Sequence, residues 1–88
     1  MTQEEILQGL KKNLKISGYY HDEDLKQKIA ETISYVELKT GVTETEAISK
    51  YAYVIIRGAS DLFNYDNYQE LFLDLIKNIG IYGSGGNA

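Results

Sequence analysis

The sequence predicts a small all-α domain of four helices, and three features of the chain lead to this prediction. Apolar residues recur at spacings of three and four in four separate stretches, which is the period of an amphipathic helix. Glycine and asparagine separate these stretches, and the 88-residue chain contains no proline. With 43% hydrophobic and 25% charged residues, the composition is that of a single globular unit. We expect a helical domain over residues 1–80 and a flexible, glycine-rich C-terminal tail over residues 81–88.

The first helix is predicted over residues 3–15. Thr2 and Glu5 have the spacing of a capping box, in which each side chain accepts a hydrogen bond from the other residue's backbone N–H. An apolar stripe with a period of four begins at Ile6. The helix should stop before Gly18, because glycine favours turns.

The second helix is predicted over residues 22–40. Asp22 is the expected N-cap, and Glu23 and Asp24 lie in the first turn, where the helix dipole favours negative charge. Gly41 follows the last turn and suits the left-handed conformation that commonly ends a helix.

The third helix is predicted over residues 44–63, opened by a second capping box at Thr43 and Glu46. It is the most apolar of the four, so we expect it at the centre of the fold. Gly58 in its middle lowers helix stability by about 1 kcal/mol relative to alanine, which suggests a close approach between helices. Residues 51–56 alone would also suit a buried strand, but the cap upstream and the absence of an intervening turn residue favour a helix.

The fourth helix is predicted over residues 67–79, with Asn67 and Glu70 at cap spacing and Gly80 as its end. Ile79, Ile81 and Tyr82 continue the apolar character up to and past that glycine. Two interpretations remain open for them: they fold back on the core, or they are held ready for a partner.

The net charge of the chain argues against tight binding of nucleic acid. The chain contains nine basic and thirteen acidic residues, for a net charge of −4. Proteins that bind DNA or RNA gain most of their affinity from contacts of Lys and Arg with phosphates. Lys11, Lys12 and Lys15 form the only basic cluster, which we interpret as a solvated helix face. Arg57, the single arginine, has the spacing of an i,i+4 ion pair with Asp61.

No catalytic, cofactor-binding or metal-binding constellation is recognisable, so we predict a protein that is not an enzyme and needs no cofactor. His21 is the only histidine, and the acids beside it are explained more simply as a helix start. Ser60-Asp61-Leu62 is similar to the Asp-Ser-Leu motif of acyl carrier proteins. However, Ala59 replaces the aspartate, and Ser60 falls late in a helix.

The sequence predicts neither a membrane-spanning helix nor a signal peptide. The longest apolar run covers residues 51–56, far short of the roughly 20 residues that a spanning helix needs. The segment Met1–Gln8 starts polar and acidic, unlike a signal peptide.

Tyrosine is unusually frequent, with eight copies and no tryptophan. Tyrosine suits positions with one apolar and one wet end, and it is enriched at protein interfaces. Four tyrosines fall at the predicted helix junctions and are candidates for a subunit interface: Tyr19, Tyr20, Tyr65 and Tyr68. The alternative is that these rings close the edges of a small core.

The stretch from Asp22-Glu23-Asp24-Leu25 to Thr40-Gly41 resembles the second helix of the small head–tail connector proteins of long-tailed bacteriophages, also called adaptor or head-completion proteins. The hydrophobic segment that ends in Leu62-Phe63-Asn64-Tyr65 is similar in character to the next helix of that family, and the resemblance covers roughly residues 3–79. Members often carry an arginine just after the aromatic residue of this helix, where the present chain has Asn64-Tyr65-Asp66-Asn67.

The resemblance implies a structural virion protein, made in the host cytoplasm, that forms a homo-oligomeric ring below the portal protein. Such a ring extends the DNA channel, lets DNA pass without specific binding, and offers a docking face to the tail or a stopper protein. Under this interpretation Ile79, Ile81 and Tyr82 are candidate portal contacts. The candidate channel-facing acids are Asp22, Glu23, Asp24, Glu44 and Glu46. The alternative function is a small acidic helical module that regulates another protein by binding it.

Overall fold

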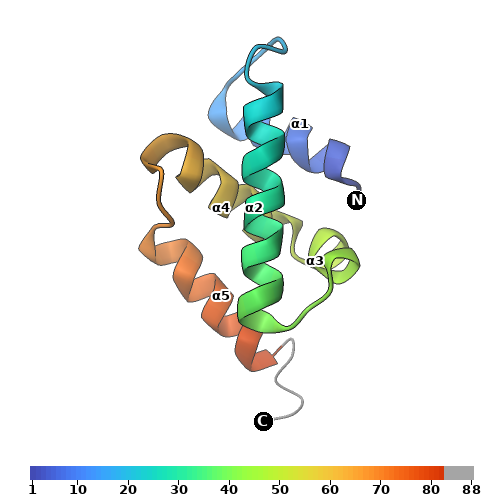
Figure 1. Cartoon of the computed structure of the whole chain (residues 1–88), viewed down its shortest axis with the longest axis vertical. Helices are drawn as coiled ribbons and strands as arrows, with labels where there is room; N and C mark the ends of the chain where they lie inside the picture. The colour runs from blue at the N-terminus through green and yellow to red at the C-terminus, as the bar shows by residue number, and fades with distance from the viewer. Residues whose placement is uncertain (83–88) are drawn as a thin grey trace.

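The computed structural model describes residues 1–82, and over these residues the chain is all-α, as predicted (Figure 1). The five helices of this part of the chain are α1 (Gln3–Leu14), α2 (Asp22–Thr40), α3 (Glu44–Lys50), α4 (Ala52–Tyr65) and α5 (Glu70–Tyr82). None of them is both long enough and apolar enough to cross a membrane. Of the tail predicted over residues 81–88, residues 83–88 lie outside the described part of the chain.

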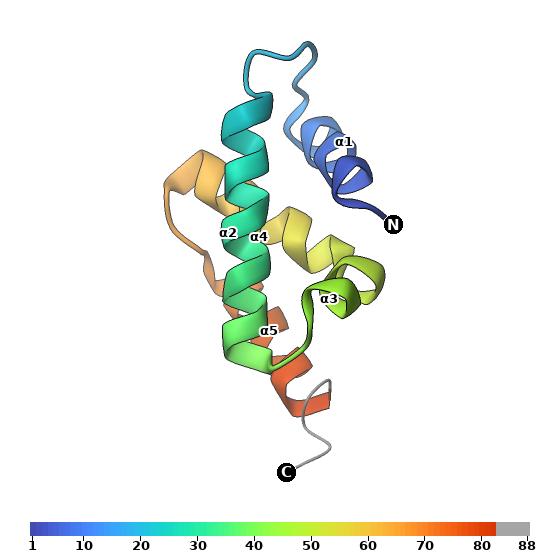
Figure 2. The ribbon, with the colours of Figure 1, turned by 45° about the vertical axis from the view of Figure 1, so that its right-hand side comes forward.

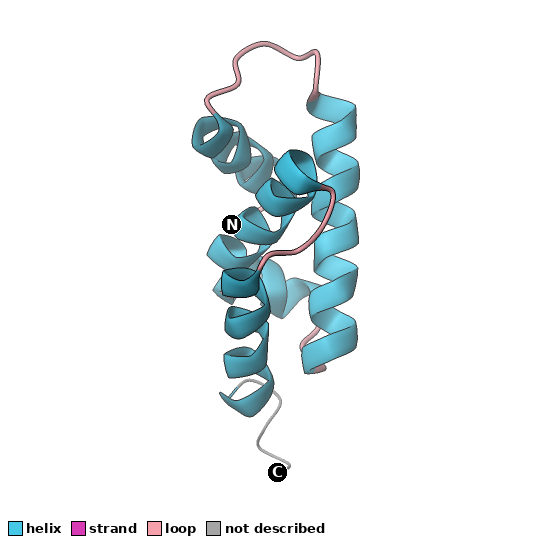
Figure 3. Cartoon of the chain, turned by 90° about the vertical axis from the view of Figure 1, so that its left-hand side faces the viewer, coloured by secondary structure: helices cyan, strands magenta, loops and turns pink. Residues whose placement is uncertain are grey.

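Helix α2 runs along the long axis of the molecule and forms a layer of its own. Figures 1 and 2 show α4 crossing behind α2, and in Figure 3 α2 stands on one side with the other helices on the opposite side. Both α2 and α4 contact each of the other helices. The core between them is aliphatic, and Phe72 of α5 is its largest fully buried side chain.

Local signals set the ends of the first two helices. The capping box is confirmed: the Thr2 hydroxyl accepts from the Glu5 N–H at 3.2 Å, and the Glu5 carboxylate accepts from the Thr2 N–H at 2.8 Å. Helix α1 ends slightly earlier than predicted, because Lys15 takes the left-handed conformation, with φ of 60°. Helix α2 ends at Thr40, and the φ of 82° at the following Gly41 confirms the predicted left-handed stop.

The prediction of a single third helix over residues 44–63 is wrong. The chain turns at Tyr51, and this turn separates α3 from α4. Tyr51 has φ of −122° and ψ of 30°, outside the helical range, and it ends α3 while it begins α4. Its N–H still reaches the Ala47 carbonyl at 2.9 Å, and its own carbonyl accepts from Val54 at 2.9 Å. The helical hydrogen bonds are therefore interrupted only briefly, at a residue type that does not signal a turn.

The fourth predicted helix corresponds to α5, but both of its predicted ends are wrong. It begins at Glu70 instead of residue 67, and its backbone remains helical to Tyr82, past Gly80. The Gln69 N–H just before it donates to the Asp61 carboxylate at 3.0 Å. Asp61 lies on α4, so the group that caps α5 comes from another helix and not from Asn67. The proposed boundary between residues 80 and 81 falls inside this helix.

Gly58 is a point of close approach between α4 and two of its neighbours, α2 and α5, as its position in the sequence suggested. A Cβ atom on Gly58 would lie 2.6 Å from Thr32 Cγ2 of α2 and 2.5 Å from Phe72 Cε1 of α5. Both distances are shorter than van der Waals contact, so the three helices meet where only glycine fits.

Candidate functional site

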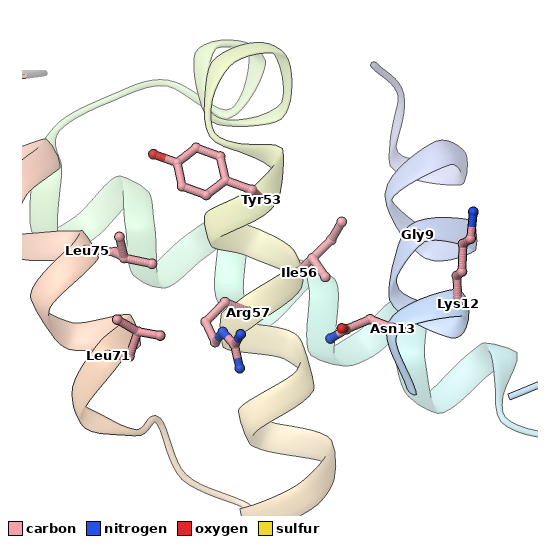
Figure 4. A pocket seen from close by; sticks show the side chains of 8 residues that line it. All are labelled: Gly9, Lys12, Asn13, Tyr53, Ile56, Arg57, Leu71 and Leu75. Carbon is pink, nitrogen blue, oxygen red and sulfur yellow. The ribbon is translucent and has the colours of Figure 1, made fainter. Parts of the chain in front are cut away.

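An open groove lies between α1, α4 and α5, on the side of α4 away from α2 (Figure 4). Its volume is about 590 Å³, and the residues that line it are Gly9, Lys12, Asn13, Tyr53, Ile56, Arg57, Leu71 and Leu75. Tyr53 and Leu71 are 61% and 55% exposed, so a large part of the apolar lining faces solvent. Such a surface favours a hydrophobic contact with another molecule.

The groove is cationic. Lys12 of α1 and Arg57 of α4 are exposed, and its lining contains no acid. Within residues 1–82 neither cation forms an ion pair. The predicted pair of Arg57 with Asp61 does not form, because Asp61 is 3% exposed and accepts from the Gln69 N–H instead. Arg57 therefore presents its charge to the groove.

The loop between α1 and α2 is held by Lys11, which the sequence placed on a solvated face. Its side chain is only 8% exposed, and its Nζ atom lies 2.8 Å from Asp22 Oδ1 and donates to the Gly18 carbonyl at 2.6 Å. Nζ also lies 5.1 Å from the centroid of the Tyr19 ring. Asp22 is thus the first residue of α2 and an ion-pair partner, not the predicted N-cap. His21 takes the cap position without a side-chain hydrogen bond.

Three of the four candidate interface tyrosines are exposed. Tyr19, Tyr20 and Tyr65 are 84%, 92% and 62% exposed. Tyr68 differs, because its ring stacks on Phe72 at 4.5 Å between centroids and lies 4.6 Å from that of Tyr35. The alternative interpretation, a ring that closes the edge of the core, is the one that the geometry of Tyr68 supports.

Burial of the Tyr68 side chain has an electrostatic consequence. Desolvation raises the pKa of its hydroxyl above the ordinary value of 10.0, and the negative charge of Glu31 acts in the same direction. The Tyr68 hydroxyl also donates a hydrogen bond of 3.4 Å to Thr32 Oγ1 of α2. Tyr68 therefore keeps its proton at and above neutral pH.

His21 lies between two aromatic rings. Its ring meets that of Tyr20 edge-on at 4.9 Å and that of Phe63 at 5.4 Å. Over the part of the chain that the structure describes, no three His, Cys, Asp or Glu side chains come together as a metal site would require. The imidazole thus joins the loop between α1 and α2 to the end of α4.

The five candidate channel-facing acids do not form one cluster. Asp22, Glu23 and Asp24 open α2, where Asp22 pairs with Lys11, Glu23 lies 3.7 Å from Lys26, and Asp24 lies 3.1 Å from Lys28. The other two acids belong to α3, which follows the opposite end of α2. There Glu44 accepts from Gln3 at 2.8 Å, and Glu46 lies 3.4 Å from Lys50. Glu23 is the most exposed of the ion-paired acids, at 93%.

The C-terminal apolar residues divide into two groups. Ile79 is 5% exposed and belongs to the core, so it is not available as a portal contact. For this residue the fold-back interpretation is correct. The side chains of Ile81 and Tyr82 lie outside the described part of the chain.

Ser60 has no exposed surface on which a prosthetic group could be attached. It is 4% exposed in the middle of α4, and its hydroxyl oxygen accepts from Asn64 at 3.5 Å. This burial excludes the carrier-protein interpretation in the fold as it stands.

The outer face of α2, which the sequence analysis did not single out, is a second candidate surface. It consists of the exposed residues Gln27, Ala30, Glu31, Ser34 and Leu38. Leu38 is 79% exposed, more than any other leucine, isoleucine or valine in a helix whose side-chain exposure the structure describes. Leu38 stands outside the apolar stripe of α2, and that isolation was a signal available in the sequence.

Comparisons with known proteins found no relative of this chain: no family model, no curated protein and no solved structure matches it.

Proposed function

We propose that the chain is a structural virion protein, a head–tail connector that forms a ring below the portal of a long-tailed bacteriophage. The ring extends the DNA channel and offers its far face to the tail or a stopper protein. The proposal starts from the sequence resemblance over residues 3–79, and its finer terms, the virion location and the portal and tail partners, come from that resemblance.

The observation that best supports an assembly role is the exposed apolar lining of the groove between α1, α4 and α5. Isolated apolar side chains are common on protein surfaces, but a grouped patch favours an interaction. Tyr53 and Leu71 belong to one such group, and Tyr19 and Tyr20 are two further exposed rings, adjacent in sequence, in the loop between α1 and α2. A small domain with several exposed groups of this kind suits a subunit that is covered by neighbours on more than one side.

The acids at the start of α2 suit the wall of a DNA channel. Glu23 and Asp24 carry side chains that are 93% and 50% exposed, and their ion pairs with Lys26 and Lys28 leave the start of α2 without an excess of positive charge. A channel lined with lysines would retain DNA through release of its counterions, whereas acids leave the duplex free to slide. We therefore expect no salt-sensitive binding of duplex DNA near physiological salt. Such binding at micromolar affinity would contradict the channel role.

The decisive experiment combines the purified protein with the portal protein of the same phage and measures the mass of the complex by native mass spectrometry. The proposal predicts many copies of the chain on each portal ring. A protein that never binds the portal, at any concentration, would overturn it. Binding of one or two copies to some other protein would favour the alternative function, a regulatory interaction module.

A further inference from the structure

The groove and the outer face of α2 lie on opposite sides of the molecule. Gly58 of α4 faces α2, since a Cβ atom there would meet Thr32. At about 100° per residue, Tyr53 and Ile56 lie about 140° and 160° around α4 from Gly58. These two residues therefore line the groove on the side of α4 that is turned away from α2, as Figure 4 shows.

The same argument places the outer face of α2 on the far side of that helix. Thr32 is a residue of α2 that faces α4, since its Cγ2 atom would meet a Cβ atom on Gly58. Ala30 and Ser34 each lie two residues from Thr32, about 160° around the helix, and Leu38 lies about 120° around it. Figure 3 shows α2 alone on its side of the molecule, so nothing in the described part of the chain covers this face.

The charges of the two surfaces are complementary. The groove carries Lys12 and Arg57, and the outer face of α2 carries Glu31 with Glu37 at its edge. None of these four side chains forms an ion pair within residues 1–82. The two surfaces also match in character: Leu38 projects from one, and Tyr53 and Leu71 offer it an apolar lining in the other.

We propose that the outer face of α2 in one copy of the chain docks into the groove between α1, α4 and α5 of the next copy. An amphipathic helix laid into an apolar groove is a common mode of recognition. The two contact surfaces are different, so the contact is head-to-tail and leaves a free groove and a free α2 at the two ends of any open chain of copies. Depending on the rotation between copies, the series closes into a ring. The inference rests on the self-association in the proposed function, but not on the portal.

The test uses two substitutions that each block one surface at an exposed position. Leu38→Arg places a cation on α2 that would face Arg57, and Leu71→Arg adds a cation to the groove. Both side chains are more than half exposed, so the fold should survive, and circular dichroism with urea unfolding verifies this. Leu73→Arg is the matched control, because Leu73 is 41% exposed on α5 but does not line the groove.

Analytical ultracentrifugation at high protein concentration should show oligomers for the wild type and for Leu73→Arg. Each blocked variant alone should associate about tenfold more weakly, or more weakly still. An equimolar mixture of the two blocked variants should form dimers and stop there, because one variant supplies an intact α2 and the other an intact groove. A wild type that stays monomeric, a blocked variant that assembles normally, or a mixture that forms no dimer would overturn the inference.

The results separate this inference from the proposed function. Rings on the portal that persist with both blocked variants would keep the connector role and refute the groove contact. Head-to-tail dimers in the mixture, together with a failure to bind any portal, would keep the contact and refute the connector role.

Discussion

Lys11 Nζ lies 2.8 Å from Asp22 Oδ1, and this pair joins the last turn of α1 to the first residue of α2 across the loop between them. The two side chains are 8% and 17% exposed, so solvent screens the attraction only weakly. The same ammonium group also donates to the Gly18 carbonyl, so one side chain contacts both the loop and the start of α2.

We predict that Lys11→Met lowers the free energy of unfolding by about 2 kcal/mol, because it leaves the Asp22 carboxylate and the Gly18 carbonyl without their partner. Urea denaturation measures the change. Lys12→Met is the control, since Lys12 is exposed and forms no ion pair within residues 1–82. Equal stability of the two variants would show that Lys11 does not hold the loop.

A second prediction concerns the contact of three helices at Gly58. Gly58→Ala should destabilise the protein by about 1–2 kcal/mol, because the overlap with Phe72 and Thr32 outweighs the gain in helix propensity. Gly9→Ala is the comparison. Its Cβ would lie 3.0 Å from Ile56 Cδ1, the far end of a half-buried side chain that can move. In thermal unfolding, the Tm of Gly9→Ala should be well above that of Gly58→Ala. The reverse order of the two Tm values would contradict the packing described.

A third prediction concerns the cap that α4 supplies to α5. Asp61→Ala should cost about 1–2 kcal/mol of stability, as the loss of a side-chain cap usually does, and Asp61→Asn should cost less because it keeps an acceptor oxygen. Asp74→Ala, an exposed change on α5, should have an effect within about 0.5 kcal/mol. The three variants are compared by urea unfolding. Equal effects of Asp61→Ala and Asp74→Ala would refute the capping role.

A fourth prediction follows from the raised pKa of Tyr68. The folded state holds the hydroxyl proton more tightly than the unfolded chain does, so stability falls as the pH rises through the window between the ordinary value of 10.0 and the higher folded pKa. Below that window the contribution is fully present. Tyr68→Phe keeps the ring stack but removes the titrating group, so its stability should decline less above pH 10.0 than that of the wild type. Parallel declines in the two proteins would contradict this account.

The features that could be predicted from the sequence are those set by near neighbours. The capping box at Thr2 and the left-handed stop at Gly41 each depend on residues within a few positions of one another. The close approach at Gly58 involves distant residues, but a glycine inside an apolar helix was itself a signal of it. The all-α class follows from the period of the apolar residues, which is likewise a local property.

The features that escaped prediction depend on contacts between distant residues. Nothing in the residue type of Tyr51 marks the turn there, and the cap of α5 comes from Asp61, a residue of another helix. The groove could not be predicted for the same reason: the residues that line it come from three different helices. Only the folded structure brings Lys12, Arg57 and Leu71 to the same surface.

The head-to-tail contact can be tested most directly by cross-linking, because the chain contains no cysteine. In the double variant Leu38→Cys/Leu71→Cys, a short bismaleimide reagent should join α2 of one copy to the groove of the next. The result should be a ladder of covalent oligomers that extends beyond the dimer. Leu38→Cys/Leu73→Cys is the matched control and should give far less product, while each single variant can reach only a dimer. The account predicts a ladder specific to the first pair, and a double variant that cross-links no better than its control would contradict it.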